Sequence, residues 1–155
     1  AQLNDIHLHI HHLAPSCSSE ENFKGVLYGE GRGVFDGEIL VERSAQQTEA
    51  HLQNHNLLLN PDAIINTKPQ LQIYADEVKC SHGTTVGQIE PEQLFYLRSR
   101  GVDEHTAWRM LCRGFADEIF DKVGSEPLRD YLIEQFDQIL KKSELVSGNL
   151  GVSHD

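Results

Sequence analysis

The chain has 155 residues, of which 39% are hydrophobic and 24% are charged, a composition typical of one ordinary folded domain or a domain with a small appendage. No apolar run approaches the roughly 20 residues that a membrane-spanning helix needs, and no secretory signal is visible at the start. The formal net charge of −11 is spread along the chain without a basic stripe, which argues against nucleic acid and anionic lipid surfaces as partners.

The first predicted element is a strand that carries a run of histidines. Apolar Ile6, Leu8 and Ile10 alternate with His7, His9 and His11, so the imidazoles share one face of the strand. Imidazoles spaced about 7 Å apart could bind zinc or iron. The alternative is an exposed polar face without a ligand, because neighbouring positions on one strand rarely converge on a single ion.

From residue 25 to residue 80 the pattern is that of a β-rich region. Apolar residues come in short alternating or clustered sets interrupted by Gly, Asn, Asp or Pro, which predicts strands of three to six residues joined by frequent turns. Eight of the twelve glycines lie between Gly25 and Gly101, consistent with turns and close backbone approaches. The pattern leaves a β-sandwich, a barrel and a parallel β-helix open.

The segment around Cys80 is the densest in chemical groups. If the strand that contains Val78 continues, Cys80 and His82 project to one face about 7 Å apart. A thiolate with an imidazole could form a metal site, or a nucleophile with its base. The alternative is a buried cysteine beside a hydrogen-bonded histidine.

Two pairs of acidic residues are candidate catalytic groups. Asp36 with Glu38, and Asp76 with Glu77, could serve a β-helix enzyme that cleaves polysaccharides, although most such pairs are solvated turn residues. The phosphate-binding, esterase and zinc-protease motifs are absent from the sequence.

After Glu90 the periodicity becomes helical. Pro91 predicts the start of a first helix that Gly101 ends, Asp103 is a predicted N-cap for a second helix, and Ser125 to Pro127 begins a third. We therefore predict a β domain at residues 1–90, a helical domain at residues 91–142 and a flexible tail at residues 143–155.

The three cysteines, Cys17, Cys80 and Cys112, are odd in number and widely spaced, without a CxxC pair. A disulfide framework or a zinc ribbon is therefore not indicated. Reduced thiols are typical of a cytoplasmic protein, which is the predicted location.

Four segments carry a resemblance to a known family. They are RGVFDGEILV at 32–41, QNHNLLLN at 53–60, TKPQLQIYADEVKCSHGTTVGQI at 67–89 and QLFYLRSRGV at 93–102. Together they resemble the C-terminal end of the core shared by the SufB/SufD family of iron–sulfur cluster assembly proteins. Residues 76–87 favour the SufD branch, so the chain is expected to be a C-terminal piece of a longer protein.

The resemblance implies a fold and a set of partners. The implied fold is mainly β, a partial right-handed parallel β-helix followed by a small C-terminal helical domain. The implied role is that of a non-enzymatic scaffold subunit, whose helices bind SufC, an ABC-type ATPase, and whose β region pairs with SufB, or with a second copy when SufB is absent.

The resemblance also implies roles for individual residues. His82, and second to it Cys80, match the segment near the SufB–SufD interface and become candidates for iron acquisition or cluster formation. The expected cofactor state is no stable cofactor on this chain alone, with iron or a nascent cluster at the shared interface. The ATPase-docking candidates are Tyr96, Arg98, Arg100 and Trp108.

Two rival hypotheses remain from the residues themselves. One is the polysaccharide-cleaving β-helix enzyme that uses acidic turn residues, and the other is a metal-binding module centred on His7, His9 and His11. The histidine run matches no motif of the resembled family.

Overall fold

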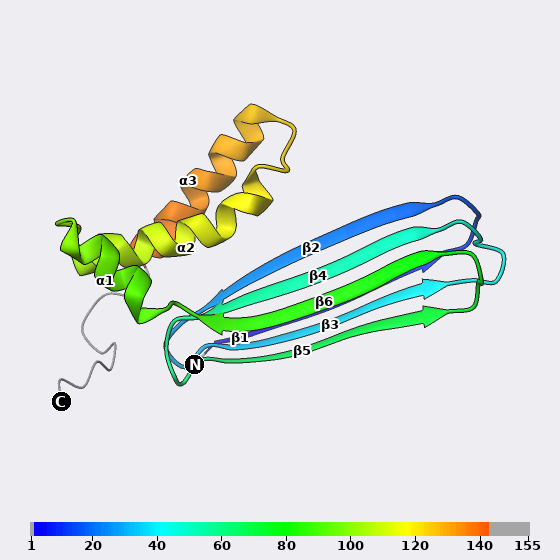
Figure 1. Cartoon of the computed structure of the whole chain (residues 1–155), viewed down its shortest axis with the longest axis horizontal. Helices are drawn as coiled ribbons and strands as arrows, with labels where there is room; N and C mark the ends of the chain where they lie inside the picture. Colours follow the sequence, from blue (N-terminus) through cyan, green and yellow to red (C-terminus); the bar gives the residue numbers. More distant parts are fainter. Residues whose placement is uncertain (1, 143–155) are drawn as a thin grey trace.

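The computed structural model describes residues 2–142, which form six strands followed by three helices (Figure 1). The predicted flexible tail at residues 143–155 lies outside the described residues. Each strand has ten residues. The elements are β1 (Leu3–His12), β2 (Ser18–Leu27), β3 (Arg32–Val41), β4 (Glu49–Leu58), β5 (Ile64–Ile73), β6 (Lys79–Gln88), α1 (Pro91–Ser99), α2 (Glu104–Phe120) and α3 (Glu126–Lys142).

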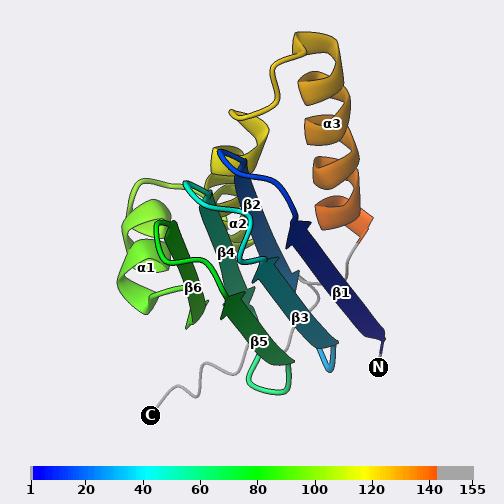
Figure 2. The ribbon, with the colours of Figure 1, turned by 90° about the vertical axis from the view of Figure 1, so that its right-hand side faces the viewer.

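Successive strands alternate between two sheets. One sheet has the order β1-β3-β5 and the other the order β2-β4-β6, and both are seen side by side in Figure 2. Every strand pair in residues 2–142 is parallel, as in the register of Ile6 with Phe35 and of Phe35 with Thr67. The mainly β fold followed by helices is therefore confirmed, and a sandwich built from antiparallel hairpins, which the sequence left open, is excluded.

The prediction of strands of three to six residues was wrong, because several glycines lie inside strands rather than in turns. Gly37 lies within β3, where an added Cβ would come 2.8 Å from the ring of Phe35 and 3.0 Å from Leu52. A Cβ added at Gly33 on the same strand would collide with the side chain of Ile65. These glycines let side chains of neighbouring strands pack against the backbone, so they extend the strand instead of ending it.

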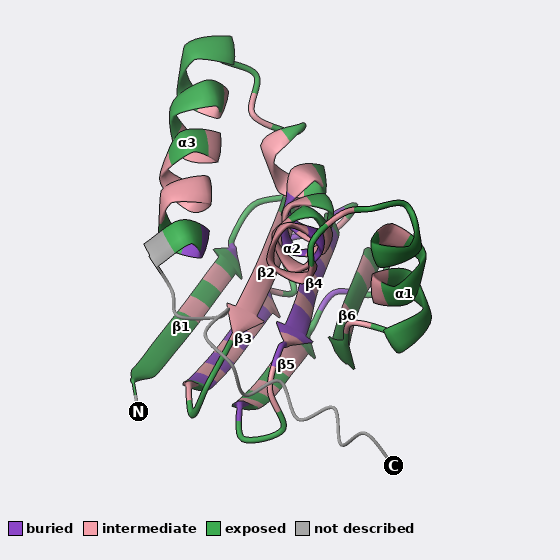
Figure 3. Ribbon diagram, turned by 90° about the vertical axis from the view of Figure 1, so that its left-hand side faces the viewer, coloured by how far each residue is buried: buried purple, intermediate pink, exposed green. Residues whose placement is uncertain are grey.

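The main core lies between the sheets and is centred on β3 and β4. Burial on β3 alternates strictly, and Phe35, Ile39 and Val41 are at most 2% exposed. Leu52 on β4 is fully buried opposite them. Figure 3 shows the buried positions gathered on these two central strands, since each has a paired strand on both sides. Alternation of this kind defines which side chains point between the sheets.

The three helices begin where the sequence predicts. Pro91 occupies the first position of α1, and Gly101 follows it with a φ of 88°, a conformation that glycine adopts without strain. The side chain of Asp103 accepts a hydrogen bond of 2.9 Å from the backbone N–H of Thr106 and so caps α2. The change from strands to helices falls between Gln88 and Pro91.

A second apolar cluster holds the helices against the sheet formed by β2, β4 and β6. Leu57 and Leu59 from the strand region pack with Cys112 of α2 and Leu140 of α3. Trp108 is partly buried against this cluster. The helices therefore cover part of one sheet's outer face, while the outer face of β1, β3 and β5 lies on the opposite side of the molecule (Figure 1).

Replacing Phe35 with Ala is expected to lower the free energy of unfolding by about 3–5 kcal/mol, because the ring fills the space between the sheets. Phe95→Ala is the matched control, since Phe95 is 73% exposed and its loss should change stability by less than about 0.5 kcal/mol. Urea unfolding followed by circular dichroism measures both, and equal effects of the two variants would contradict this assignment of the core.

Candidate functional site

Strand β6 places Cys80 and His82 on the face that points between the sheets. Cys80 pairs in register with Ala50, and His82 pairs with Leu52, two residues that are fully buried. Ser81 between them points to the outer face, where its hydroxyl lies 2.7 Å from Nδ1 of His51. The strand alternation predicted for Cys80 and His82 is therefore confirmed.

The two side chains differ in their surroundings. Cys80 is partly buried against the main core, and this burial raises the pKa of its thiol. His82 is exposed, and its imidazole makes no hydrogen bond or ion pair with the part of the chain that the structure describes. A raised thiol pKa means that a metal ion must displace a proton from Cys80, whereas the imidazole of His82 is open to an incoming ligand.

His82 is exposed because β6 is the last strand of its sheet. Strand β5 is likewise the last strand of the other sheet, so the two form adjoining edges at one end of the described structure. The hydroxyl oxygens of Thr67 on β5 and Thr84 on β6 lie 3.1 Å apart and link the two edges directly. Along their outer sides, β5 and β6 have no hydrogen-bonded neighbouring strand within residues 2–142.

Cys80 and His82 do not complete a metal site within the described residues. No group of three or more His, Cys, Asp or Glu side chains in residues 2–142 is arranged to hold a metal ion. A tetrahedral zinc site or an iron–sulfur cluster takes about four protein ligands. Further ligands would therefore have to come from outside this part of the chain.

Three of the four histidines of β1 are each paired with a carboxylate. Nε2 of His7 lies 3.0 Å from Asp5, Nδ1 of His9 lies 2.7 Å from Glu38, and the third pair is His11 with Glu42 at 3.0 Å. The three imidazoles share the solvent-facing side of the strand, as the alternation predicts. The neighbouring His12, which the sequence did not single out, is buried and lies 3.0 Å from the hydroxyl of Ser19.

The acidic pairs that suggested a polysaccharide enzyme lie on the protein surface. Asp36 accepts a hydrogen bond of 3.1 Å from Gln70, and Glu38 is paired with His9 and with Gln72 on the outer face of the β1-β3-β5 sheet. Asp36 and Glu38 thus interact with side chains of neighbouring strands. Neither residue lines the cavity that lies between the sheets.

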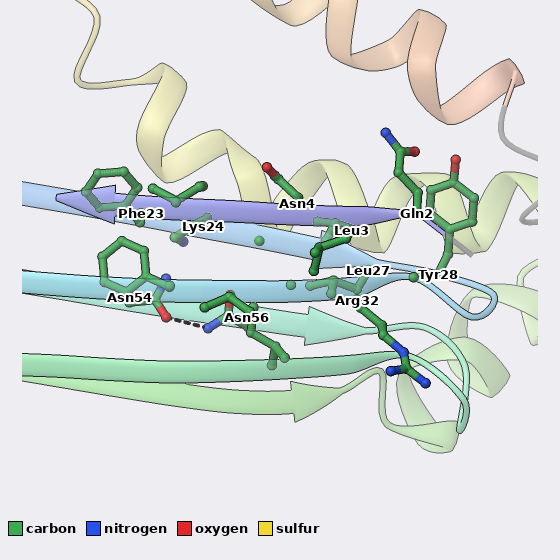
Figure 4. A pocket seen from close by; sticks show the side chains of 18 of the residues that line it. Gln2, Leu3, Asn4, Phe23, Lys24, Leu27, Tyr28, Arg32, Asn54 and Asn56 are labelled. Atoms are coloured by element: carbon green, nitrogen blue, oxygen red, sulfur yellow. Dashed lines mark hydrogen bonds between the residues drawn. The ribbon is translucent and has the colours of Figure 1, made fainter.

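A cavity of about 810 Å³ lies between the sheets beside β1, β2 and β3 (Figure 4). Its polar floor is formed by Asn54 and Asn56, whose amides hydrogen-bond to each other at 2.7 Å. Glu30 is the single acidic residue in its lining. A carboxylate pair for glycoside hydrolysis is therefore missing from this cavity, and Cys80 and His82 do not reach it.

Helix α1 carries an exposed group of aromatic and basic residues. Tyr96 is 56% exposed, and the guanidinium of Arg100 lies over its ring at 5.0 Å from the centroid. Arg98 forms an ion pair of 3.2 Å with Glu104. Together with Phe95, these residues define what we call the α1 patch: Phe95, Tyr96, Arg98 and Arg100.

Trp108, the fourth docking candidate, lies on α2 and is partly buried. Its ring packs against the second apolar cluster, and its indole N–H is buried without a hydrogen-bond partner in the described structure. Trp108 thus helps to hold α2 on the sheet.

Lys24 makes contacts that the sequence does not predict. Its ammonium group donates a hydrogen bond of 2.8 Å to the backbone carbonyl of Phe115, pairs with Glu118 at 2.5 Å and lies 4.7 Å from the centroid of the Phe115 ring. This lysine fastens β2 to α2. An isolated lysine in a strand gives no sequence signal for a contact 91 residues away.

The thiols give a test of these surroundings. Burial raises the pKa of Cys112 to about 12, so at pH 8 only about one thiol in ten thousand is ionised. Iodoacetamide at pH 8 should therefore leave Cys112 unmodified in the folded protein and modify Cys80 more slowly than an unperturbed thiol. All three cysteines should react in urea. Mass spectrometry of peptides measures this, and rapid labelling of Cys112 in the folded state would contradict its placement.

Comparison with known proteins identifies the family of this chain. The model of the SufBD core domain of the SUF system for iron–sulfur cluster assembly matches residues 1–115. The chain is 42% identical over 131 residues to the iron–sulfur cluster assembly protein SufD of Escherichia coli K12, which covers 84% of this chain and 31% of that protein.

Two further relatives come from photosynthetic organisms. An iron–sulfur cluster assembly SufBD family protein of Synechocystis is 43% identical over 122 residues, covering 79% of this chain and 27% of that protein. Protein ABCI7, chloroplastic, of Arabidopsis thaliana is 42% identical over 130 residues, which cover 83% of this chain and 27% of that protein. The chain thus spans roughly a third of the length of these relatives.

No helix in residues 2–142 is both long and apolar enough to cross a membrane. The family model covers most of the chain, including both sheets, Cys80, His82 and the α1 patch. These matches confirm the resemblance drawn from the sequence, and the chain belongs to the SufBD family of the SUF system for iron–sulfur cluster assembly.

Proposed function

We propose that this chain is a non-catalytic scaffold region that brings an ABC-type ATPase, SufC, and the paralogue SufB to the place where a nascent iron–sulfur cluster forms. Family membership supports the pathway. The observation that carries the specific proposal is the position of His82: exposed, unengaged within the described chain, and next to Cys80 on an edge strand.

The first part of the proposal concerns the fold. Two parallel sheets joined by strands that alternate between them are the arrangement expected of turns of a parallel β-helix. In such a solenoid each turn contacts only its neighbours, so the last turn presents open strand edges. We infer that β5 and β6 are that last turn.

The second part concerns the partner at these edges. The outer sides of β5 and β6 present backbone N–H and C=O groups that another chain can pair with by strand addition. A paralogue with similar terminal strands would satisfy both edges at once, and a second copy of this chain would do so in its absence. The partner would then lie directly beside His82.

The third part concerns the metal. His82 and Cys80 supply an imidazole and a thiol, a donor pair that suits iron or zinc. Because the described residues contain no third ligand nearby, the iron or nascent cluster would be shared with the partner and would not rest stably on this chain alone. His82 would act as the primary ligand or proton acceptor, and Cys80 as the second.

The fourth part concerns the ATPase. The α1 patch combines exposed aromatic rings with two arginines, and aromatic and arginine side chains dominate binding energy at protein interfaces. We propose that the ATPase docks on Tyr96, Arg98 and Arg100. Trp108 would act indirectly, by fixing α2 on the sheet.

Reducing conditions suit this role. The three cysteines are all free thiols, and we propose that the protein acts in the cytoplasm.

Replacing His82 with Ala should reduce cluster formation by the reconstituted complex by at least about tenfold, while the melting temperature and association with SufB and SufC stay unchanged, because the side chain is exposed. His7→Ala is the matched control, since His7 is an exposed strand histidine on β1, at the opposite edge of the sheets from β5 and β6. Absorbance of the assembled cluster measures the effect. Normal assembly by His82→Ala would remove His82 from the proposal.

Replacing Tyr96 with Ala should weaken binding of SufC by about tenfold or more, as loss of an interface hot spot does. Tyr131→Ala on α3 is the matched control, because Tyr131 is 57% exposed compared with 56% for Tyr96. Isothermal titration with purified SufC gives both affinities. Unchanged affinity for Tyr96→Ala, or equal losses for the two variants, would contradict docking on the α1 patch.

A further inference from the structure

Two histidines of β1 lie close together on the solvent-facing side of the β1-β3-β5 sheet. The rings of His9 and His11 are 6.0 Å apart between centroids and meet edge to face. Their side chains are 55% and 37% exposed, and the helices cover the other sheet (Figure 1). Nothing in the proposed scaffold function uses this face.

Each of the two rings is held by its own carboxylate on β3 or just after it. Nδ1 of His9 lies 2.7 Å from Glu38, and Nε2 of His11 lies 3.0 Å from Glu42. Glu38 also pairs with Gln72 on β5, so it is fixed from the far side. A neutral imidazole that donates one N–H to a carboxylate keeps a lone pair on its other nitrogen.

The remaining nitrogens, Nε2 of His9 and Nδ1 of His11, have no hydrogen-bond partner within residues 2–142. A carboxylate that orients an imidazole through one nitrogen while the other nitrogen binds metal is the usual outer-shell arrangement of histidine metal sites. Each carboxylate thus orients its ring through one nitrogen, Nδ1 of His9 or Nε2 of His11, and leaves the other nitrogen available to a metal ion.

We propose that His9 and His11 together bind one divalent first-row transition-metal ion, with water completing its coordination. A metal–nitrogen bond of about 2.0–2.1 Å puts each ring centroid roughly 3.2 Å from the ion, so two rings on one tetrahedral ion are roughly 5 Å apart. The observed 6.0 Å between the centroids is close to that separation, and we expect rotation of the two side chains to bring both nitrogens onto one ion.

His7 does not take part in this site. It has no ring contact with His9 among the described residues, and its imidazole pairs with Asp5 on the same strand. The proposed site thus has two histidine ligands and not the three of the metal-binding module considered from the sequence. This number is consistent with the lack of any three-ligand group in residues 2–142.

The chemistry of the two ligands selects the metal. Imidazole nitrogen suits zinc, copper, nickel and iron, whereas magnesium and calcium prefer oxygen ligands. The net charge of −11 raises the local concentration of cations around the chain. Protons compete for the same nitrogens, so binding weakens as the pH falls.

The test is isothermal titration of the full chain with Zn²⁺ alone, in a buffer that does not chelate metals. The double variant His9→Gln with His11→Gln is compared with the matched control His51→Gln with His55→Gln, two histidines on the other sheet. Circular dichroism melting checks the fold of each variant. We expect wild type and control to bind one zinc with the same affinity and the β1 variant to bind it at least tenfold more weakly.

A second readout tests the two carboxylates as orienting groups. Glu38→Gln with Glu42→Gln should weaken zinc binding by about tenfold or more, because outer-shell partners of metal-bound histidines contribute to that extent. Mg²⁺ should give no heat attributable to these residues in any variant. Undetectable zinc binding by wild type, unchanged affinity in the β1 variant, or equal losses in both histidine variants would overturn the proposal. These results are independent of cluster formation and of SufC binding.

Discussion

Each inner strand of this protein is paired on both sides, and its partners lie about thirty residues away along the chain. His51, for example, contacts Ser81, 30 residues later. Strands β3 and β4 therefore have hydrogen-bonded neighbours on both sides. They carry the core residues Phe35 and Leu52. Strands β5 and β6 are the last strands of their sheets, so each has one side without a paired strand in residues 2–142. The exposure of His82, and with it the proposed metal chemistry, follows from this edge.

The helices depend on the sheets in turn. Helix α2 is held by the apolar cluster around Leu57 and Cys112 and by Lys24, whose ammonium group reaches the backbone of α2. Because Lys24 lies on β2 and Leu57 on β4, the helices are anchored to the same sheet whose last strand is β6. A partner bound to the α1 patch would therefore be connected to the β6 edge through α2 and this sheet.

Several features could be predicted from the sequence because they depend on neighbouring residues. The cap at Asp103, the helix end at Gly101 and the shared face of Cys80 and His82 require only local geometry. Strand length was predicted wrongly, because Gly33 and Gly37 have the sequence signature of turns, while in the structure they provide room for Ile65 and the Phe35 ring. A local sequence pattern does not show which side chains of other strands, or of the same face of the strand, will pack against a glycine.

The sequence by itself determined the family, the order of β region and helices, and which residues are candidates for metal binding or docking. Only the tertiary structure decided which of these residues are available. It packed Trp108, partly buried, against the apolar cluster, left His82 exposed on an edge strand, and paired His9 and His11 with carboxylates on or just after β3. The physical reason is that exposure and pairing arise between segments about thirty residues or more apart, where the spacing set by parallel strands, not the local sequence, brings side chains together.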